Sequence, residues 1–192
     1  MSEPIEAANH DRRAYLRAPK AVAAAGAAIV LAVSGGMAIS PQDRYTVQVP
    51  GGLAFAEFKG YEDWQTIAVS QSGDKIEVIL GNPAMINAYR TGASGNGRPF
   101  PDGARMAKIH WNAKQSTEAP SPTTIPGTLH DIDFMVKDSK RFADSGGWGY
   151  AEFDYDAGSD SFKPYGDGAK CGFACHQLVA AKDYVFTAYP KR

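Results

Sequence analysis

The two cysteines of this chain lie close together near its C-terminal end, and a histidine directly follows the second, in the segment 171–176 (CGFACH). Two thiols can add to the vinyl groups of a haem, and a histidine beside the second thioether has its imidazole delivered to the iron. The usual segment has two residues between the cysteines, whereas this one has three. A disulfide between Cys171 and Cys175, a metal site with further ligands and free thiols therefore stay open as alternatives.

The first 38 residues have the layout of an export signal. A basic cluster precedes a run without ionisable side chains over residues 21–39. Small residues near the end of this run predict cleavage after Ser34 or Ala38. The run approaches the length that spans a bilayer but is rich in Ala and Gly, so an uncleaved anchor formed by residues 21–39 is the alternative. We expect a periplasmic protein whose functional domain covers residues 39–192.

Charge and cysteine content argue against two classes of protein. Residues 39–192 contain 16 basic and 18 acidic side chains, which leaves no excess of positive charge for binding nucleic acid. Two cysteines are too few for a disulfide-held scaffold in a domain of this size. A length of roughly 155 residues is enough for one hydrophobic core. We therefore expect a single domain without a nucleic-acid partner.

Alternating and β-branched residues predict an antiparallel sheet of about five strands. Turn-forming residues at 71–74 predict that the first two strands form a hairpin. In the third strand, Met106, Lys108 and His110 share one face because side chains alternate along a strand. The five strands are expected at residues 65–70, 75–80, 104–111, 129–136 and 148–155.

Helices are expected to be few and short, which makes the predicted fold class α+β. The apolar spacing of residues 53–64 predicts a short helix that leads into the first strand. Asn82 and the proline after it predict the start of a helix over residues 83–91, and Gly92 predicts its end. A glycine-rich loop is expected over residues 92–103 and a proline-rich loop over residues 119–127. One further helical turn is expected over residues 137–142.

Several motifs occur in the order and at the spacing typical of one family of haem proteins. They are FPDG, MAK, VKDSKRF, GWGY and DYVFT, at residues 100–103, 106–108, 136–142, 147–150 and 183–187. On these motifs the chain resembles the cytochrome P-460 family, whose relatives include the cytochromes c-prime-beta. The resemblance implies a homodimer with one covalently attached haem c, held through Cys171, Cys175 and His176. It also implies a five-coordinate iron whose distal side is open to small molecules.

The resemblance also gives Lys108 a role at the haem. Hydroxylamine-oxidising members of the family carry a lysine cross-linked to the haem macrocycle, and the order of the motifs places Lys108 at that position. From the residues alone, a lysine that reaches water from an edge strand is the simpler interpretation. The family's oxidases use a distal arginine on an earlier strand, whereas residues 75–80 contain none. Three carboxylates could relay protons, namely Glu152, Asp154 and Asp167. Most carboxylates of this kind are only solvated surface groups.

A sixth protein ligand to the iron would make the protein an electron carrier. A lone methionine or histidine in a strand is usually a core or surface residue, so this interpretation has little support. The residues that could serve are Met106, Met135, His110, His130 and Met85. Aromatic residues could instead wall the pocket and keep the sixth position open, and the candidates are Phe100, Phe134 and Phe153.

Three functions follow from these expectations. The favoured one is oxidation of a small nitrogen compound, hydroxylamine or nitric oxide, with electrons passed to an acceptor cytochrome. The second is non-catalytic binding of nitric oxide or carbon monoxide, as in the cytochromes c-prime-beta. The third is electron transfer by a low-spin cytochrome.

Overall fold

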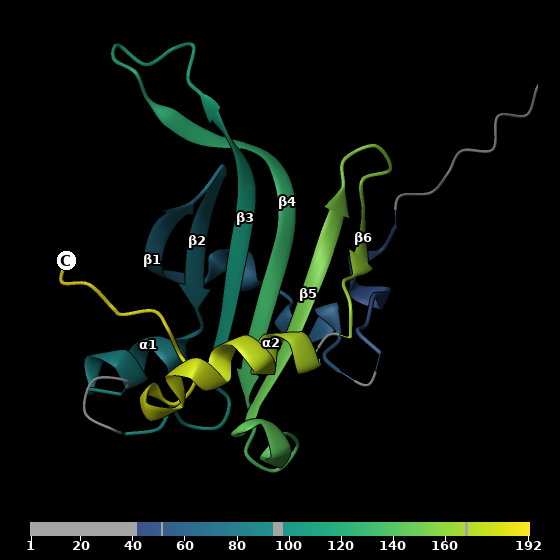
Figure 1. Cartoon of the computed structure of the whole chain (residues 1–192), viewed down its shortest axis with the longest axis vertical. Coiled ribbons are helices and arrows are strands. Elements are labelled where there is room, and N and C mark those ends of the chain that lie inside the picture. The colour runs from purple at the N-terminus through teal and green to yellow at the C-terminus, as the bar shows by residue number, and fades with distance from the viewer. Residues whose placement is uncertain (1–41, 51, 94–97, 168) are drawn as a thin grey trace, which may run out of the picture. The chain divides into compact units, whose positions relative to one another are not determined.

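Six strands form one antiparallel sheet in which each strand pairs with its neighbours in the chain, in the order β1-β2-β3-β4-β5-β6 (Figure 1). The architecture is that of a computed structural model, which describes residues 42–50, 52–93, 98–167 and 169–192. The predicted α+β class with a dominant antiparallel sheet is confirmed. The strands are β1 (Gln65–Ser72), β2 (Lys75–Gly81), β3 (Arg105–Gln115), β4 (Thr124–Lys137), β5 (Trp148–Asp156) and β6 (Ser161–Pro164).

The five expected strands are all present, and a sixth lies at the edge of the sheet. This strand, β6, has only four residues, which are too few for alternation to stand out in a sequence. β3 and β4 are longer than expected because they continue into an arm beyond the other strands (Figure 1). The loop expected over residues 119–127 is therefore partly wrong, since β4 begins at Thr124 and includes Pro126 in its pairing. A proline is tolerated where a strand has a partner on one side only.

Among the described residues, two α-helices and five short 3-10 helices accompany the sheet. The predicted helix α1 is confirmed, because the Asn82 side chain accepts a hydrogen bond of 3.0 Å from the backbone N–H of Met85, and Pro83 occupies the first turn. The helices are α1 (Pro83–Arg90), α2 (Ala169–His176), η1 (Arg44–Thr46), η2 (Phe55–Phe58), η3 (Tyr61–Asp63), η4 (Ala143–Ser145) and η5 (Gln177–Lys182).

The prediction of a helix over residues 53–64 is wrong. Two separate 3-10 turns, η2 and η3, occupy this segment, and Gly60 separates them with a left-handed φ of +81°. Phe55 and Phe58 are both fully buried, as the three-residue repeat of a 3-10 turn allows. Tertiary burial of these rings therefore decides the local structure.

The helical turn expected over residues 137–142 lies elsewhere. Lys137 still belongs to β4, and the carboxylate of Asp138 then accepts hydrogen bonds from the backbone N–H groups of Lys140 and Arg141, at 3.1 and 2.9 Å. An aspartate side chain that binds the backbone in this way forms a turn in place of a helix start. The single helical turn, η4, begins only at Ala143.

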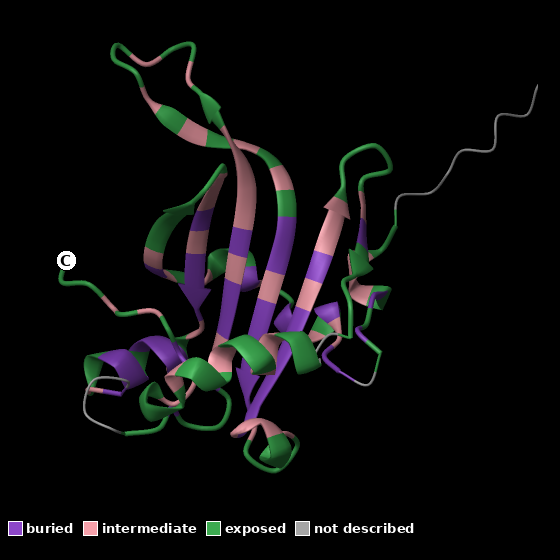
Figure 2. Cartoon of the chain, viewed as in Figure 1, coloured by how far each residue is buried: buried purple, intermediate pink, exposed green. Residues whose placement is uncertain are grey.

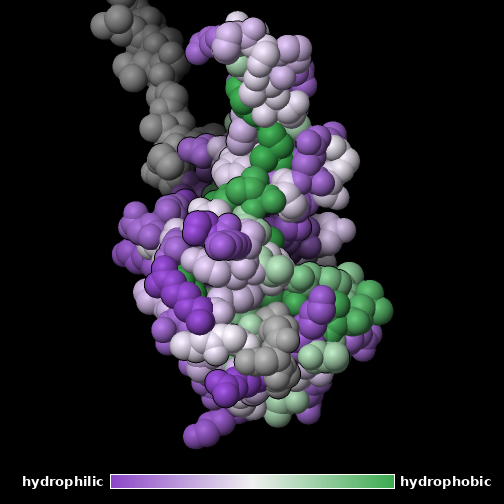
Figure 3. Space-filling view, turned by 90° about the vertical axis from the view of Figure 1, so that its left-hand side faces the viewer, coloured by the Kyte–Doolittle hydropathy of each residue, from purple (hydrophilic) through white to green (hydrophobic). Residues whose placement is uncertain are grey.

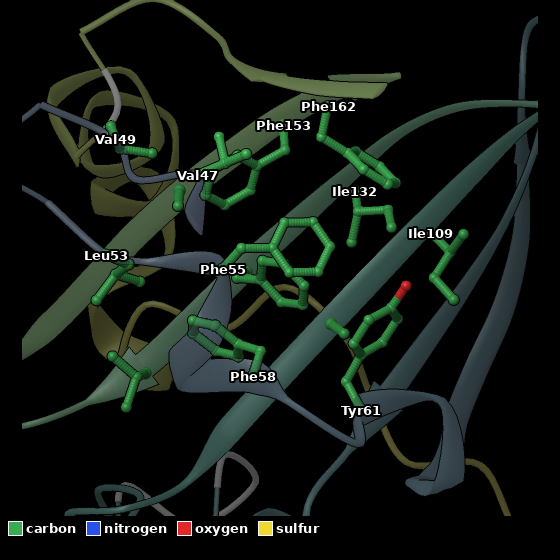
Figure 4. Close-up of a cluster of buried hydrophobic side chains, with 14 of the residues drawn as sticks. Val47, Val49, Leu53, Phe55, Phe58, Tyr61, Ile109, Ile132, Phe153 and Phe162 are labelled. Atoms are coloured by element: carbon green, nitrogen blue, oxygen red, sulfur yellow. The ribbon is translucent and has the colours of Figure 1, made fainter. Parts of the chain in front are cut away.

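The aromatic side chains of η2 and η3 cover one face of the sheet. Figure 4 shows Phe55 and Phe58 pointing into a cluster with residues of β3, β4 and β5. The Phe58 ring stacks on Phe134 with centroids 4.1 Å apart, and Phe55 lies 5.1 Å from Phe153. Full burial of each such ring contributes about 1.5–3 kcal/mol. This core leaves the opposite face of the sheet for the functional pocket.

The helix α2 and the segment after η5 lie over that opposite face (Figure 1). The strands beneath α2 are buried at their centres, while the outer surface of α2 is exposed (Figure 2). A second apolar cluster fills part of this layer and includes Met106, Met135, Trp148, Tyr150 and Val185.

The surface at the β1 edge consists mostly of hydrophilic residues, with hydrophobic residues gathered in smaller areas (Figure 3). Within the part of the chain that the structure describes, no helix has the length and apolar character needed to cross a membrane. The signal or anchor expected over residues 1–38 lies outside the described residues.

Candidate functional site

A pocket of about 450 Å³ lies between the sheet and α2. This volume falls within the range of about 300–1,000 Å³ that is usual for cofactor and ligand sites. Strands β1 to β5, α2 and the segment after η5 contribute its walls. Five of the candidate residues from the sequence line this one pocket, namely Lys108, Glu152, Cys171, Cys175 and His176.

The two cysteines present their thiols along one side of α2. Cys171 and Cys175 are four residues apart, so they lie one helical turn apart on the same face, and both are exposed free thiols. Gly172 lets the helix approach the sheet closely, because a Cβ at this position would lie only 2.5 Å from the Cβ of Tyr150. Contact with the sheet therefore stabilises this helix, which sequence analysis did not predict.

His176, the last residue of α2, is held in a fixed orientation. Its Nδ1 donates a hydrogen bond of 2.6 Å to the backbone carbonyl of Tyr184. The rings of Tyr150 and Phe186 lie 5.0 and 5.1 Å from the imidazole, between centroids. Because the proton is on Nδ1, Nε2 keeps the lone pair that can bind a metal. Burial lowers the pKa of His176, which favours the neutral, metal-binding form.

The carbonyl that orients His176 belongs to a backbone segment with two unusual conformations. Asp183 and Tyr184 have φ values of +50° and +63°, in the left-handed region that non-glycine residues rarely adopt. The Asp183 carboxylate accepts hydrogen bonds from Lys137 Nζ at 2.6 Å and from the backbone N–H of Phe100 at 2.7 Å. These contacts hold the segment against β4 and so position the Tyr184 carbonyl.

The sheet side of the pocket carries a group of ionisable residues. Lys108, Asp133 and Glu152 are register partners on β3, β4 and β5 and therefore form one row across the sheet. Lys108 Nζ also lies 3.1 Å from Glu77 Oε2 on β2, and that oxygen accepts a hydrogen bond of 2.6 Å from the Ser70 hydroxyl. The pocket thus combines one ammonium group with three carboxylates.

These carboxylates differ in protonation. Burial, with repulsion from Glu152 and Asp131, raises the pKa of Asp133 to about 7. The pKa of Glu152 is also raised, first by burial and then by neighbouring negative charge. Burial alone would raise the pKa of Glu77, but the hydrogen bonds that its carboxylate accepts lower it overall. Asp133 therefore exchanges its proton near neutral pH while Glu77 stays ionised.

The pocket fits a haem bound beside α2. It brings together two thiols on one helix face and an imidazole whose Nε2 is available. The Tyr150 hydroxyl is buried against the pocket and has no hydrogen-bond partner among the described residues. A buried hydroxyl without a partner is costly unless a bound group supplies one.

Comparison with known proteins agrees with this geometry. Residues 58–187, well over half of the chain, match the family described as cytochrome P-460. The chain belongs to the cytochrome P-460 family. The matched region contains all six strands and every residue of the pocket, and membership implies a haem protein. No curated protein matches the chain.

Several residues considered for a cytochrome P-460 site lie elsewhere. Asp154 and Asp167 are not part of the pocket lining, and Met85 is a fully buried residue of α1. Met106 and Met135 do line the pocket, although both residues are largely buried. His110 and His130 lie outside the lining, where they contact acidic side chains.

The expectation that aromatic residues of the sheet wall the pocket is wrong for Phe100 and Phe153, which pack in the two cores. Phe134 borders the pocket, but its ring stacks on Phe58 on the opposite face. The apolar lining includes Ile79 of β2 and Val185 and Phe186 of the C-terminal segment, besides Met106 and Met135.

Sequence analysis missed two acidic residues of the pocket, Glu77 and Asp133. A signal for Asp133 was available, because the expected strand over residues 129–136 alternates and places Asp131, Asp133 and Met135 on one face. Only the pairing register shows that this face meets Lys108.

Proposed function

We propose that this protein is a periplasmic, homodimeric c-type cytochrome that oxidises a small nitrogen compound, such as hydroxylamine or nitric oxide. Cys171 and Cys175 would hold one haem through thioether bonds, and Nε2 of His176 would bind its iron. Electrons pass to an acceptor cytochrome. Family membership and the arrangement of the three residues on α2 support the haem assignment.

The observation that favours an enzyme over a simple carrier is the ionisable row in the haem pocket. Lys108 shares the pocket with Glu77, Asp133 and Glu152. Binding a neutral diatomic gas needs no charged groups, whereas oxidation of an N–H or O–H compound releases protons that a nearby base must accept. A carboxylate with a pKa of about 7, as in Asp133, suits that task at neutral pH.

When bound, a haem would supply a binding site for the nitrogen compound and a route for its electrons. The protein contributes orientation and proton transfer. Tyr184 and the two aromatic neighbours fix the His176 ring, so Nε2 would be presented to the iron in one orientation. Lys108 holds Glu77 by its ion pair and is the residue that we propose would link the protein to the macrocycle. Asp133 accepts a proton, and Glu152 lies next to it as a second acceptor.

A gas-binding protein is the second candidate, because part of the pocket is apolar. Ile79, Met106, Met135 and Phe186 line this part and carry no group that ionises. An apolar surface of this kind accepts nitric oxide or carbon monoxide without exchanging protons.

The deciding experiment combines intact mass with optical spectra of the protein exported to a periplasm. Haem mass retained after denaturation, with a long-wavelength ferrous band, supports the lysine-modified oxidase. Retained haem with an ordinary high-spin spectrum supports gas binding, and a six-coordinate low-spin spectrum supports electron transfer with a methionine ligand. A chain without haem and two mass units below the reduced form has a Cys171–Cys175 disulfide, which would contradict the proposal.

A further inference from the structure

His110 on β3 has a carboxylate at each of its two ring nitrogens. Its Nε2 lies 3.5 Å from Oε1 of Glu77, which lines the pocket. Its Nδ1 donates a hydrogen bond to Oδ1 of Asp131 and lies 3.9 Å from Oδ2 of Asp133. An imidazole can take up a proton at one nitrogen and release one from the other. His110 thus connects the pocket to Asp131.

Asp131 extends this connection toward the surface. The residue is only 6% exposed, and its second oxygen, Oδ2, accepts a hydrogen bond from Nδ1 of His130. The His130 side chain is 46% exposed, so the connection ends in solvent. Four side chains therefore link the pocket to water, in the order Glu77, His110, Asp131 and His130.

The contact between His130 and Asp131 depends on an irregularity in the pairing of β3 with β4. Asp131 pairs with His110 and Leu129 pairs with Trp111, so His130 is an extra residue on β4. In a regular strand, consecutive residues such as His130 and Asp131 point to opposite faces and do not meet. A β-bulge re-aims a side chain, and such bulges are frequent beside active sites.

We propose that Glu77, His110, Asp131 and His130 form a proton exit from the haem pocket, an inference that rests on the proposed function. Each N–H or O–H bond broken during oxidation yields one proton, while the electrons leave through the haem to the acceptor cytochrome. One proton enters at the Glu77 carboxylate as another leaves Nε2 of His130 for water. The His130 ring then turns so that this nitrogen accepts the proton that Asp131 has received from His110. The four residues therefore end each transfer with their original charge.

The charges around His110 suit this role. Burial alone would lower the pKa of His110, but the hydrogen bond to Asp131 and the charge of Asp133 raise it overall, against the opposing charge of Lys108. Two histidine donors lower the pKa of Asp131 although burial opposes them. The raised pKa of His110 and the lowered pKa of Asp131 keep a proton on His110 and a negative charge on Asp131, so this carboxylate can take up a proton in transit without accumulation of charge. The same sheet face carries further negative charge on β5, from Glu152 and Asp154.

Flash photoreduction of the haem-loaded protein tests the exit without using the substrate. An electron added to the haem draws a proton into the pocket by the same route in reverse, and a pH-indicator dye in weak buffer follows its uptake. We expect His130→Ala to slow proton uptake at least about tenfold, since positioned acid–base groups contribute about 10²–10⁴-fold to proton transfer. Because His130 is at the surface, its removal should leave the haem spectrum unchanged, and added imidazole should restore the rate.

The matched control is Asp154→Asn, which removes one charge from the same sheet face without removing a contact of the exit. It should take up protons at the wild-type rate. Equal rates in wild type and His130→Ala, a slow rate that imidazole does not restore, or no proton uptake by the wild type would each overturn the inference. A purified protein without haem would instead contradict the proposed function.

Discussion

The ammonium group of Lys137 lies 2.6 Å from the carboxylate of Asp183, and their side chains are only 6% and 12% exposed. Lys137 also donates to the Gly146 carbonyl at 3.0 Å. The pair joins the end of β4 to the segment whose Tyr184 carbonyl orients His176. A contact remote from His176 therefore determines how the His176 side chain is held.

We expect Lys137→Met to destabilise the protein by about 3–5 kcal/mol, because it leaves a buried carboxylate without its counter-charge. The free energy of unfolding in guanidinium measures this loss. The iron–histidine stretching band of the ferrous protein should also shift or broaden, because the Tyr184 carbonyl is no longer positioned.

The control for this variant is Arg141→Met, which breaks the exposed ion pair of Arg141 with Glu57. Exposed pairs contribute at most about 1 kcal/mol, so this variant should be nearly as stable as wild type. If both variants lost the same small amount, the buried pair would not be the anchor described above.

The second prediction concerns the close packing of α2 against the sheet at Gly172. In Gly172→Ala, the new Cβ would lie 2.5 Å from the Tyr150 Cβ, which is a rigid neighbour. We expect overpacking to cost about 1–3 kcal/mol, more than the gain of up to about 1 kcal/mol in helix propensity. Haem retention, measured by intact mass, should fall. Ala174→Ser on the exposed side of the same helix should retain haem like the wild type, and equal retention in both variants would contradict the close-contact argument.

Lys108 permits a test of the proposed cross-link. Lys108→Arg keeps a positive charge beside Glu77 but removes the amine, whereas Lys108→Ala removes both. We expect both variants to lose the long-wavelength ferrous band and to retain the haem. Lys163→Ala on β6, whose residue is exposed, serves as the control and should keep the band. A band that persisted in Lys108→Ala would assign the spectrum to another feature of the pocket.

Much of the site could be predicted from the sequence, because its chemistry is concentrated in short motifs and alternating strands. The segment with Cys171, Cys175 and His176 is local, and alternation alone places Lys108 and Glu152 on one side of their strands. The antiparallel sheet followed from the same alternation.

The remaining features depend on contacts between distant residues. The helix α2 contains a glycine that weakens helix formation, and its packing on Tyr150 is invisible in the sequence. His130 lies beside Asp131 only because β4 contains a bulge, which no periodic pattern reveals. Asp133 is in an expected strand, but its role follows from the register with Lys108.

The pH dependence of stability gives the last prediction. The pKa of Asp133 is raised from 3.8 to about 7, so the folded protein binds a proton that the unfolded chain releases across this window. Its contribution therefore makes stability fall as pH rises from about 4 to 7. The pKa of His110 is raised above 6.5, so its stabilisation is complete below that pH and is lost as pH rises through the folded value. We expect the haem-loaded protein to be less stable at pH 8 than at pH 5.

Guanidinium unfolding at pH 5, 6.5 and 8 measures this dependence. Asp133→Asn cannot ionise, so its stability should change less between pH 5 and 6.5 and should exceed that of the wild type at pH 8, where the wild-type carboxylate is charged. Asp154→Asn lies on the same sheet face outside the pocket and should keep the wild-type slope. If Asp133→Asn also kept the wild-type slope, Asp133 would not carry the proton near neutral pH. The ionisable row would then lack the base on which the proposed oxidation depends.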